Sequence, residues 1–241
     1  MHRTTLLLVV AAVIAAVSAS PCSLFGQRIS SPYEFVDSKR DIGPVVAYVF
    51  TDRGAANFGP ESGMLYGVQG TFRITNPLNI GGLVAYFPAQ RRVIDPSVEE
   101  GGPIEVGKAD LDLALIAGRL TLNLTGSRSW NKLMPYATIG LGIAIDLTSD
   151  PACVAATTDP RCQIEARERF DFGSSLLGQI GFGSAWLPTN RIGARFELLN
   201  SIWRLQTPIG YFSENVALDP IPPETDWTNN FQLSLVLSYW F

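Results

Sequence analysis

Large apolar residues alternate with small or polar residues along much of this chain, and the alternation is strictest in residues 231–241. Every odd position in that segment is large and apolar: Phe231, Leu233, Leu235, Leu237, Tyr239 and Phe241. Successive side chains of a strand point to opposite faces, so a period of two predicts a strand with one apolar face and one mostly small or polar face. The segment is also long enough to cross a bilayer as a tilted strand, which takes about 9 to 11 residues.

Seven earlier segments follow a similar pattern, which gives eight expected strands. They cover residues 45–51, 64–74, 80–87, 109–125, 136–147, 169–186 and 192–202. In residues 109–125 the leucines hold odd positions up to Leu115 and even positions from Leu120, so we expect a β-bulge at Gly118. In residues 169–186 the expected apolar face includes Phe170 and Phe172, whereas both faces of residues 80–87 are apolar and their orientation stays open.

The connections between these segments alternate between long and short, and the first is long. One of the long connections is expected between Pro88 and about Gly107. Transmembrane barrels of the bacterial outer membrane have an even number of strands, short periplasmic turns and longer outer loops. The alternation therefore predicts a barrel whose short turns lie on the periplasmic side.

The face opposite the apolar one distinguishes two kinds of barrel. In residues 136–147 that face holds Thr138, Gly140, Gly142, Ala144 and Asp146. A soluble barrel would expose such a face to water and favour Lys and Glu there, whereas small residues suit a crowded lumen. We therefore predict an all-β fold, an eight-stranded antiparallel up-and-down transmembrane β-barrel; the alternative is a soluble periplasmic barrel that binds a lipophilic ligand.

The final segment resembles the C-terminal assembly signal of bacterial outer-membrane β-barrel proteins, which ends on Phe and has apolar residues at every second position upstream. The resemblance is to small OmpA/OmpX-type barrels, whose members differ in function. It implies that the odd residues of 231–241 are recognised by the barrel-assembly machinery. It also implies a location in the outer membrane, in contact with membrane lipid and lipopolysaccharide.

The first residues have the pattern of a secretory signal. A basic start, Met1 to Arg3, precedes an apolar run from Leu6 to Val17 that is too short to span the hydrocarbon of a bilayer as a helix. We expect cleavage after Ala19, a periplasmic N-terminal segment over residues 20–43, and a barrel over residues 44–241. A lipid anchor on Cys22 is an alternative, but Pro21 departs from the small residue that a lipoprotein signal has there.

Composition agrees with a barrel. Only 17% of the residues are charged, yet no apolar run of helix length follows the signal, and a membrane protein of this kind has to be a barrel. The chain has 18 basic and 22 acidic residues, a net charge of −4. This acidic balance argues against a nucleic-acid partner, which would favour a basic face.

Several charged residues fall on the faces that should line the lumen: Arg73, Arg119, Asp146, Arg169, Asp171, Arg195 and Glu197. An isolated buried charge costs several kcal/mol of desolvation, so we expect these residues to form ion pairs. Arg195 and Glu197, two apart on one strand, should lie within reach of each other. We interpret the set as a structural network that fills the lumen; a narrow ion path through rearranged pairs is the alternative.

Catalytic chemistry finds little support in the sequence. The one histidine, His2, lies in the signal, so the exported chain lacks the usual neutral-pH base that activates serine, and we expect neither enzymatic activity nor a cofactor. Cys153 and Cys162 lie in a long loop and should form a disulfide in an oxidising compartment, whereas a metal site is not expected. We predict a non-catalytic outer-membrane barrel with a structural or surface-interaction role, whose long loops meet an unidentified surface ligand; the alternative is a narrow, porin-like pore.

Overall fold

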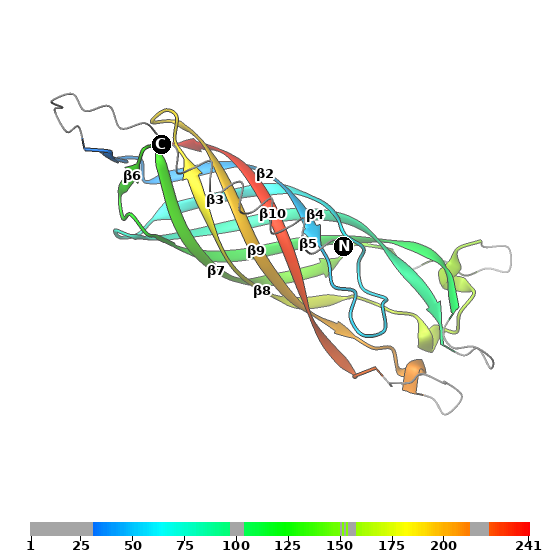
Figure 1. The fold of residues 1–241 in the computed structure, drawn as a ribbon. Coiled ribbons are helices and arrows are strands. Elements are labelled where there is room, and N and C mark those ends of the chain that lie inside the picture. Colours follow the sequence, from blue (N-terminus) through cyan, green and yellow to red (C-terminus); the bar gives the residue numbers. More distant parts are fainter. Residues whose placement is uncertain (1–30, 97–103, 150, 152, 154–157, 213–221) are drawn as a thin grey trace, which may run out of the picture. The chain divides into compact units, whose positions relative to one another are not determined.

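The structure is a computed structural model that describes residues 31–96, 104–149, 151, 153, 158–212 and 222–241. The expected signal over residues 1–19, Cys22 and much of the expected periplasmic segment lie outside these residues. The unit from Tyr33 to Phe241 is a closed antiparallel β-barrel (Figure 1). None of the helices within the described ranges has the length and apolar character needed to span a membrane.

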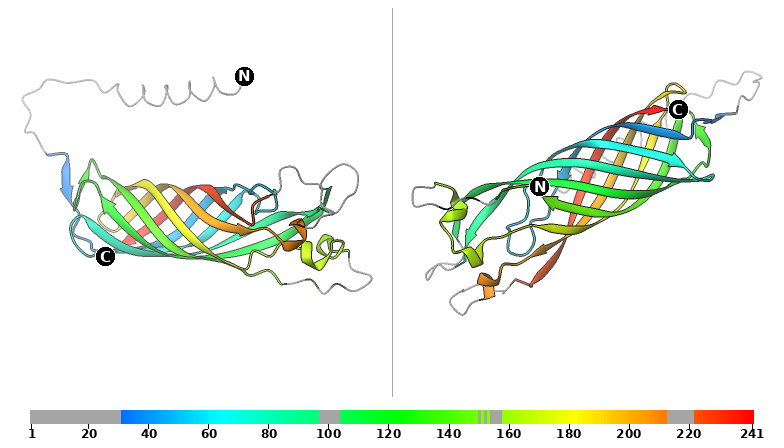
Figure 2. Two further views of the ribbon diagram at one scale, coloured as in Figure 1. Left: turned by 90° about the horizontal axis from the view of Figure 1, so that it is seen from below. Right: turned by 180° about the vertical axis from the view of Figure 1, so that it is seen from behind.

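Eight long strands form the wall, and their tilt is visible from two further sides (Figure 2). They are β2 (Arg40–Phe50), β3 (Gly63–Arg73), β4 (Leu78–Asp95), β5 (Ile104–Asn123), β7 (Leu133–Asp146), β8 (Ser174–Trp186), β9 (Ile192–Gln206) and β10 (Thr225–Trp240). Each pairs antiparallel with the next in the chain, and β10 pairs with β2 to close the wall. This arrangement confirms the predicted fold.

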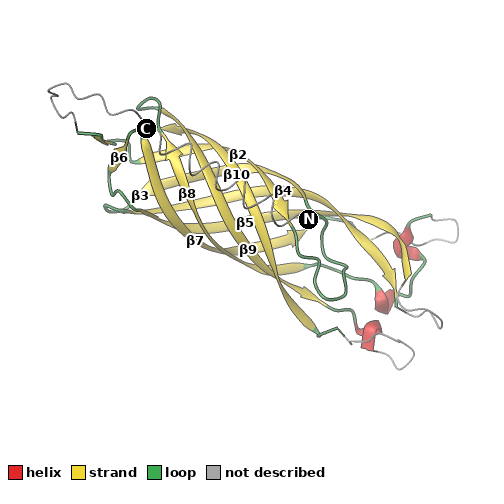
Figure 3. Ribbon diagram, viewed as in Figure 1, coloured by secondary structure: helices red, strands yellow, loops and turns green. Residues whose placement is uncertain are grey.

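The two ends of the barrel differ, as expected from the alternating connections. The connections β2–β3, β4–β5, β7–β8 and β9–β10 meet at one end, here called the long-loop end. Two of them carry three short 3-10 helices, drawn in red in Figure 3: η1 (Pro160–Cys162), η2 (Ala166–Glu168) and η3 (Ile209–Phe212). The opposite, short-turn end holds the C-terminus and two short paired strands, β1 (Tyr33–Phe35) and β6 (Arg128–Trp130).

Two expected boundaries are wrong. The polar stretch from Pro88 to Gly107 is not one long connection, because β4 runs to Asp95 and β5 begins at Ile104. The two strands stay paired across this stretch, and Gln90 Nε2 donates a hydrogen bond to Asp110 Oδ1 at 3.3 Å. Strand β2 already begins at Arg40, ahead of the expected start of the barrel at residue 44.

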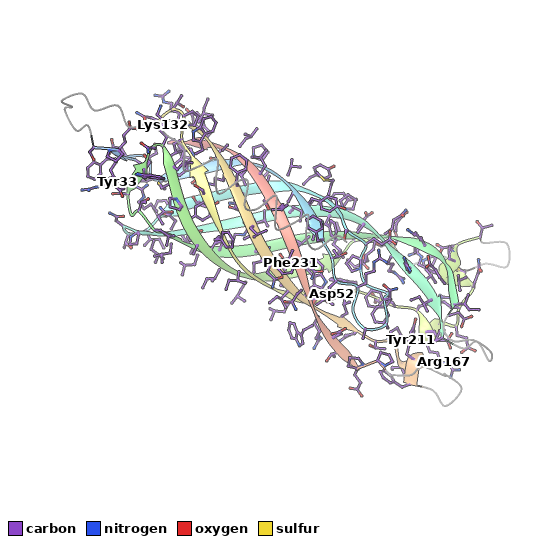
Figure 4. All side chains as sticks on the ribbon, viewed as in Figure 1. Tyr33, Asp52, Lys132, Arg167, Tyr211 and Phe231 are labelled. Atoms are coloured by element: carbon purple, nitrogen blue, oxygen red, sulfur yellow. A yellow bond between two sulfur atoms is a disulfide. The ribbon has the colours of Figure 1, made fainter. Side chains whose placement is uncertain are left out.

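The outward faces of the strands are apolar along the wall. The side chains of Leu141, Phe182 and Val84 are 71%, 62% and 60% exposed, and Val84 settles the orientation of the third expected strand. The odd residues of 231–241 also face outward, among them Phe231, which is labelled in Figure 4. A surface of this kind requires an apolar surrounding, because a soluble monomer rarely exposes a large contiguous apolar patch.

The interior changes character along the barrel axis. Towards the long-loop end it is filled by an apolar cluster. Strands β2, β4, β5 and β9 each contribute two or more residues to it and β3 contributes one: Val45, Ala47, Val49, Leu65, Leu83, Ala85, Phe87, Leu111, Leu113, Leu115, Ala117, Trp203 and Leu205. Towards the short-turn end many inward residues are polar or charged, among them Arg119, Thr121 and Asn123 on β5. A smaller apolar cluster lies beside them: Met134, Tyr136, Ala185, Leu187 and Trp240. Strand β10 is an exception, since its inward residues Thr228 and Asn230 are polar at the long-loop end.

The expected β-bulge at Gly118 is wrong, and the change from an apolar to a polar interior explains the pattern that suggested it. Strand β5 pairs with β7 without a register shift from Leu113 to Asn123, and its one shift against β4 lies at Val93/Ile94. Odd positions of β5 face inward from Ala109 to Asn123. The leucines change parity because Leu115 faces the apolar part of the lumen, whereas Leu120 faces outward beside the polar part.

The expected outward orientation of Phe170 and Phe172 is also wrong. Strand β8 begins only at Ser174, and the two rings are 4% and 7% exposed inside the apolar cluster. Gly173 has φ +56° and donates its N–H to Asp171 Oδ1 at 2.9 Å. This turn interrupts the strand geometry, so the alternation seen in the sequence does not extend through residue 173.

Candidate functional site

The polar part of the lumen is centred on an ion pair between Arg119 on β5 and Glu197 on β9. The Arg119 Nη1 to Glu197 Oε2 distance is 3.1 Å, and the two side chains are 3% and 2% exposed. Glu197 Oε1 also accepts hydrogen bonds from Gln69 Nε2 at 2.8 Å and from the hydroxyl of Tyr136 at 2.7 Å. The carboxylate therefore joins β3, β5, β7 and β9 across the lumen.

Arg119 extends this network to strand β8. Its Nη1 donates to Gln69 Oε1 at 2.7 Å and its Nε donates to Gln179 Oε1 at 3.0 Å. Gln179 Nε2 in turn donates to Ser201 Oγ at 3.1 Å. Charge-assisted hydrogen bonds of this kind are stronger than neutral ones, so the network fixes five wall strands relative to one another.

A second buried ion pair lies closer to the short-turn end. Arg195 Nη2 contacts Asp41 Oδ2, and the Thr71 hydroxyl donates to the same carboxylate. The guanidinium of Arg195 lies 5.1 Å from the ring centroid of Trp240 and 5.9 Å from that of Tyr136. Arg195 is therefore held by an opposite charge and by two aromatic faces, which is a stable setting for a buried cation.

The structure brings together three of the seven residues that we expected in the lumen, Arg119, Arg195 and Glu197. Arg195 and Glu197 do not pair with each other, since each finds its partner on another strand. Sequence reasoning missed Asp41, because the barrel was expected to begin at residue 44. The signal for it in the sequence was the alternation of the polar or small residues Asp41 and Gly43 with the apolar Ile42, which continues the pattern of the strand.

The other four expected residues lie away from this network. Arg73 ends β3, and its Nη1 donates to the carbonyl of Val36 at 2.9 Å. Asp146 ends β7 and accepts a hydrogen bond from the N–H of Thr148 at 2.7 Å. Arg169 and Asp171 precede β8 in the loop, where Asp171 is exposed. The charge network is therefore confined to the short-turn half of the barrel.

Aromatic rings from three long connections meet at the long-loop end. Phe58 packs against Phe170 with a centroid separation of 4.5 Å and against Tyr211 at 5.9 Å. Phe172 packs edge-on against Trp203 of β9 at 6.3 Å. These five residues, here called the aromatic cluster, cover the apolar part of the lumen.

The aromatic cluster is fastened to the hairpin of β4 and β5. The guanidinium of Arg91 lies 5.3 Å from the ring centroid of Phe170, and the hydroxyl of Tyr211 donates to the carbonyl of Ile94 at 3.1 Å. Burial raises the pKa of Tyr211, so its hydroxyl stays protonated and able to donate. Figure 4 shows Tyr211 and Arg167 together at the long-loop end.

Ion pairs organise the surface of the same end. Glu61 accepts a hydrogen bond from Lys108 Nζ at 2.9 Å and lies 3.8 Å from Arg53 and 3.7 Å from Arg92. Arg92 also contacts Glu105 at 3.2 Å. The hydrogen bond from Lys108 lowers the pKa of Glu61 most, with the nearby guanidinium groups acting in the same direction.

The expected disulfide between Cys153 and Cys162 is present, with a Cα–Cα distance of 5.4 Å. It closes part of the β7–β8 loop beside an ion pair of 2.8 Å between Arg161 and Asp159. In the part of the chain that the structure describes, His, Cys, Asp and Glu residues form no group of three or more suited to a metal ion.

The fold and the interior thus define a closed eight-stranded β-barrel with an apolar outer surface and a lumen filled by side chains. No family model and no curated protein matches the sequence. Among solved structures the chain is similar to Neisserial surface protein A (TM-score 0.49, 13% identity, 84% of this chain and 97% of that chain). It is also similar to the outer membrane protein OprG from Pseudomonas aeruginosa (TM-score 0.49, 11% identity, 88% and 99%) and to the outer membrane protein AlkL (TM-score 0.46, 13% identity, 93% and 96%).

Proposed function

We propose that this chain is a non-catalytic barrel of the bacterial outer membrane that acts at the cell surface through its long loops. The apolar outer surface supports a membrane location, because residues such as Ile139, Phe182 and Leu235 would otherwise face water. A soluble barrel for a lipophilic ligand would instead turn its apolar residues inward and expose polar ones.

The observation that carries this proposal is the filling of the lumen at two levels. The network of Arg119 and Glu197 joins five strands at one level, and the aromatic cluster covers the apolar level beyond it. An interior occupied in this way stabilises the barrel and leaves little room for solute. The loops are then the part of the molecule that is free to meet a partner.

Several contacts hold the described parts of the loops in place before any partner binds. The ion pairs around Glu61 join the β2–β3 loop to the β4–β5 hairpin, and the disulfide of Cys153 and Cys162 closes part of the next long loop. Groups that are already ordered lose less conformational entropy on binding. A preformed loop surface therefore favours recognition of a surface partner.

The test combines membrane location with ion conductance. Cell fractionation and a heat-modifiability gel shift should place the wild-type chain in the outer membrane as a folded barrel. Purified protein in planar bilayers should be silent, and so should Glu197→Ala, because the apolar part of the lumen stays filled when the polar network is opened. Regular current steps from the wild-type protein, or recovery of the chain from the soluble periplasm, would contradict the proposal.

A narrow pore is the second candidate function. Because part of the lumen is apolar, such a pore would pass small apolar solutes in preference to ions. The residues involved, such as Leu113, Leu115 and Phe87, are fully buried and carry no group that could replace the hydration of an ion. Vesicles that contain the protein would then take up an apolar dye faster than empty vesicles, and Phe170→Ala would increase the rate. Equal rates for both kinds of vesicle would exclude this candidate.

A further inference from the structure

Basic side chains gather at the short-turn end of the barrel. The basic residues of this end are Lys39, Arg40, Arg73, Arg128, Lys132 and Arg191. Its acidic residues include Glu34, Asp37 and Asp41, and Asp41 is already paired with Arg195 inside the barrel. Between the residues that the structure describes, no ion pair within 4.0 Å involves any of these cations. At the long-loop end, by contrast, Arg53, Arg92 and Lys108 all pair with carboxylates.

Arg40 has a particular position among these cations, because it lies on the outward face of β2 where the apolar surface ends. The next outward residue of the strand, Ile42, is apolar and 51% exposed. Arg40 lies opposite Phe72 of β3, and its guanidinium is 5.4 Å from the centre of that ring. On its other side Arg40 exchanges backbone hydrogen bonds of 3.1 Å and 2.9 Å with Phe241. A cation that lies over an aromatic ring beside an apolar surface is typical of the boundary between hydrocarbon and water.

An apolar groove of about 440 Å³ lies beside Arg40 on the outer surface of the wall. Its apolar lining comes from Ile42, Phe72, Ile80 and Phe241. Asp41 and Thr71 also border it, but the Asp41 carboxylate is buried and pairs with Arg195 inside the barrel. Gly70 lies on the same outward face, opposite Ile42, and leaves the groove open. A Cβ atom built on Gly70 would find its nearest neighbour at 3.4 Å, so the packing of the barrel does not require glycine at this position.

We propose that this groove binds an anionic phospholipid, with its phosphate at Arg40 and an acyl chain along Gly70. The inference rests on the proposed function, since only a barrel inserted in a membrane meets lipid at this surface. Charge and position argue for this occupant: a cation without an ionic partner stands at the edge of the apolar surface, and the groove beside it is apolar. A free phosphate would leave the groove empty, and an acyl chain alone would leave the guanidinium without a counterion.

Native mass spectrometry of the full-length exported protein in mixed micelles tests the site. The micelles contain equal amounts of phosphatidylglycerol and phosphatidylethanolamine, and the measurement is the fraction of each lipid that stays bound. Wild-type protein should retain phosphatidylglycerol in preference. Arg40→Gln should lower that retention about fivefold, the effect of one basic residue beside an anionic membrane surface. Gly70→Ile should lower the retention of both lipids because it fills the groove.

Two matched controls separate the site from general effects. Lys132→Gln removes one positive charge from the same end (Figure 4). Lys132 precedes β7, which does not pair with β2, β3 or β4 around the groove, so this change should leave lipid retention unchanged. Gly118→Ile adds the same side chain at another outward glycine of the same register row, where a Cβ has its nearest neighbour at 3.8 Å. It should not alter the preference for phosphatidylglycerol.

The outcomes distinguish the lipid site from the proposed function. A heat-modifiable, membrane-inserted barrel whose lipid retention is the same for wild type, Arg40→Gln and Gly70→Ile would overturn the lipid site alone. An equal loss for Arg40→Gln and Lys132→Gln would also overturn it, because it would indicate attraction by overall charge. A wild-type chain that enters neither membranes nor micelles would overturn the proposed function and the lipid site with it.

Discussion

Replacing Glu197 with alanine should be among the most damaging single changes inside the barrel. Glu197 is the counterion of Arg119, whose side chain is 3% exposed, and it also accepts hydrogen bonds from Gln69 and Tyr136. Removing one partner of a buried ion pair leaves an uncompensated charge and costs about 3 to 5 kcal/mol. We therefore expect Glu197→Ala to lower the free energy of unfolding by about this amount.

The measurement is a denaturant titration of the folded barrel in lipid vesicles, followed by tryptophan fluorescence and by the heat-modifiability gel shift. Under two-state conditions the midpoint and slope give the free energy of unfolding. The informative comparison is the double variant Arg119→Met/Glu197→Leu, which replaces both charges by apolar groups. Replacement of a whole buried pair is often neutral or stabilising. The double variant should therefore be more stable than Glu197→Ala.

Two results would refute this reasoning. A loss below about 1 kcal/mol for Glu197→Ala would mean that Arg119 is not a desolvated charge that depends on this carboxylate. A double variant less stable than Glu197→Ala would mean that the two charges do not act as a pair, since contacting residues should show a coupling energy of about 0.5 to 3 kcal/mol.

Three further predictions follow from the surface of the barrel. Leu141→Arg, in the middle of the outward face, should lower the free energy of unfolding by about 2 to 4 kcal/mol. Leu122→Arg, nearer the short-turn end, should lower it less, and equal losses for the two variants in vesicles would contradict the assignment of this face to lipid. Tyr239→Asp should reduce the amount of heat-modifiable barrel in the outer membrane, and normal levels would argue against an assembly role for residues 231–241. The hydrogen bond from Lys108 lowers the pKa of Glu61 from its ordinary value of 4.5, so this carboxylate stabilises the loop contacts above pH 4.5 and its contribution is lost as the pH falls through the lowered pKa. Amide exchange of the loop, corrected for its intrinsic pH dependence, should therefore rise at acid pH in the wild type, and a similar rise in Glu61→Gln would contradict this account.

The outward faces could be predicted from the sequence because all of them meet the same apolar environment, which requires large apolar residues at every second position. Residues such as Ile139, Phe182 and Leu235 alternate with smaller or polar ones, and each proved to face outward. The same pattern predicted the strand number and the alternation of long and short connections. The prediction failed where another rule takes over: Phe170 and Phe172 keep the alternation, yet a turn at Gly173 sends both rings into the interior.

The interior could be predicted only in part, because the sequence does not indicate which residues meet across a barrel. Arg195 and Glu197 share one face of β9, but their partners come from β2 and β5. The leucines around Gly118 change from odd to even positions for a reason that likewise cannot be read from the sequence. The change reflects a lumen that is apolar at one level and polar at another, and not a distortion of the strand.

The sequence by itself determined an eight-stranded antiparallel barrel, the orientation of its apolar surface and the disulfide of Cys153 and Cys162, because alternation and spacing along the chain are local properties. The tertiary structure alone decided the ion pairs of Arg119 and Arg195, the aromatic cluster and the groove beside Arg40. Each of these joins residues that are far apart in the chain, and the closure and register of the wall bring them together.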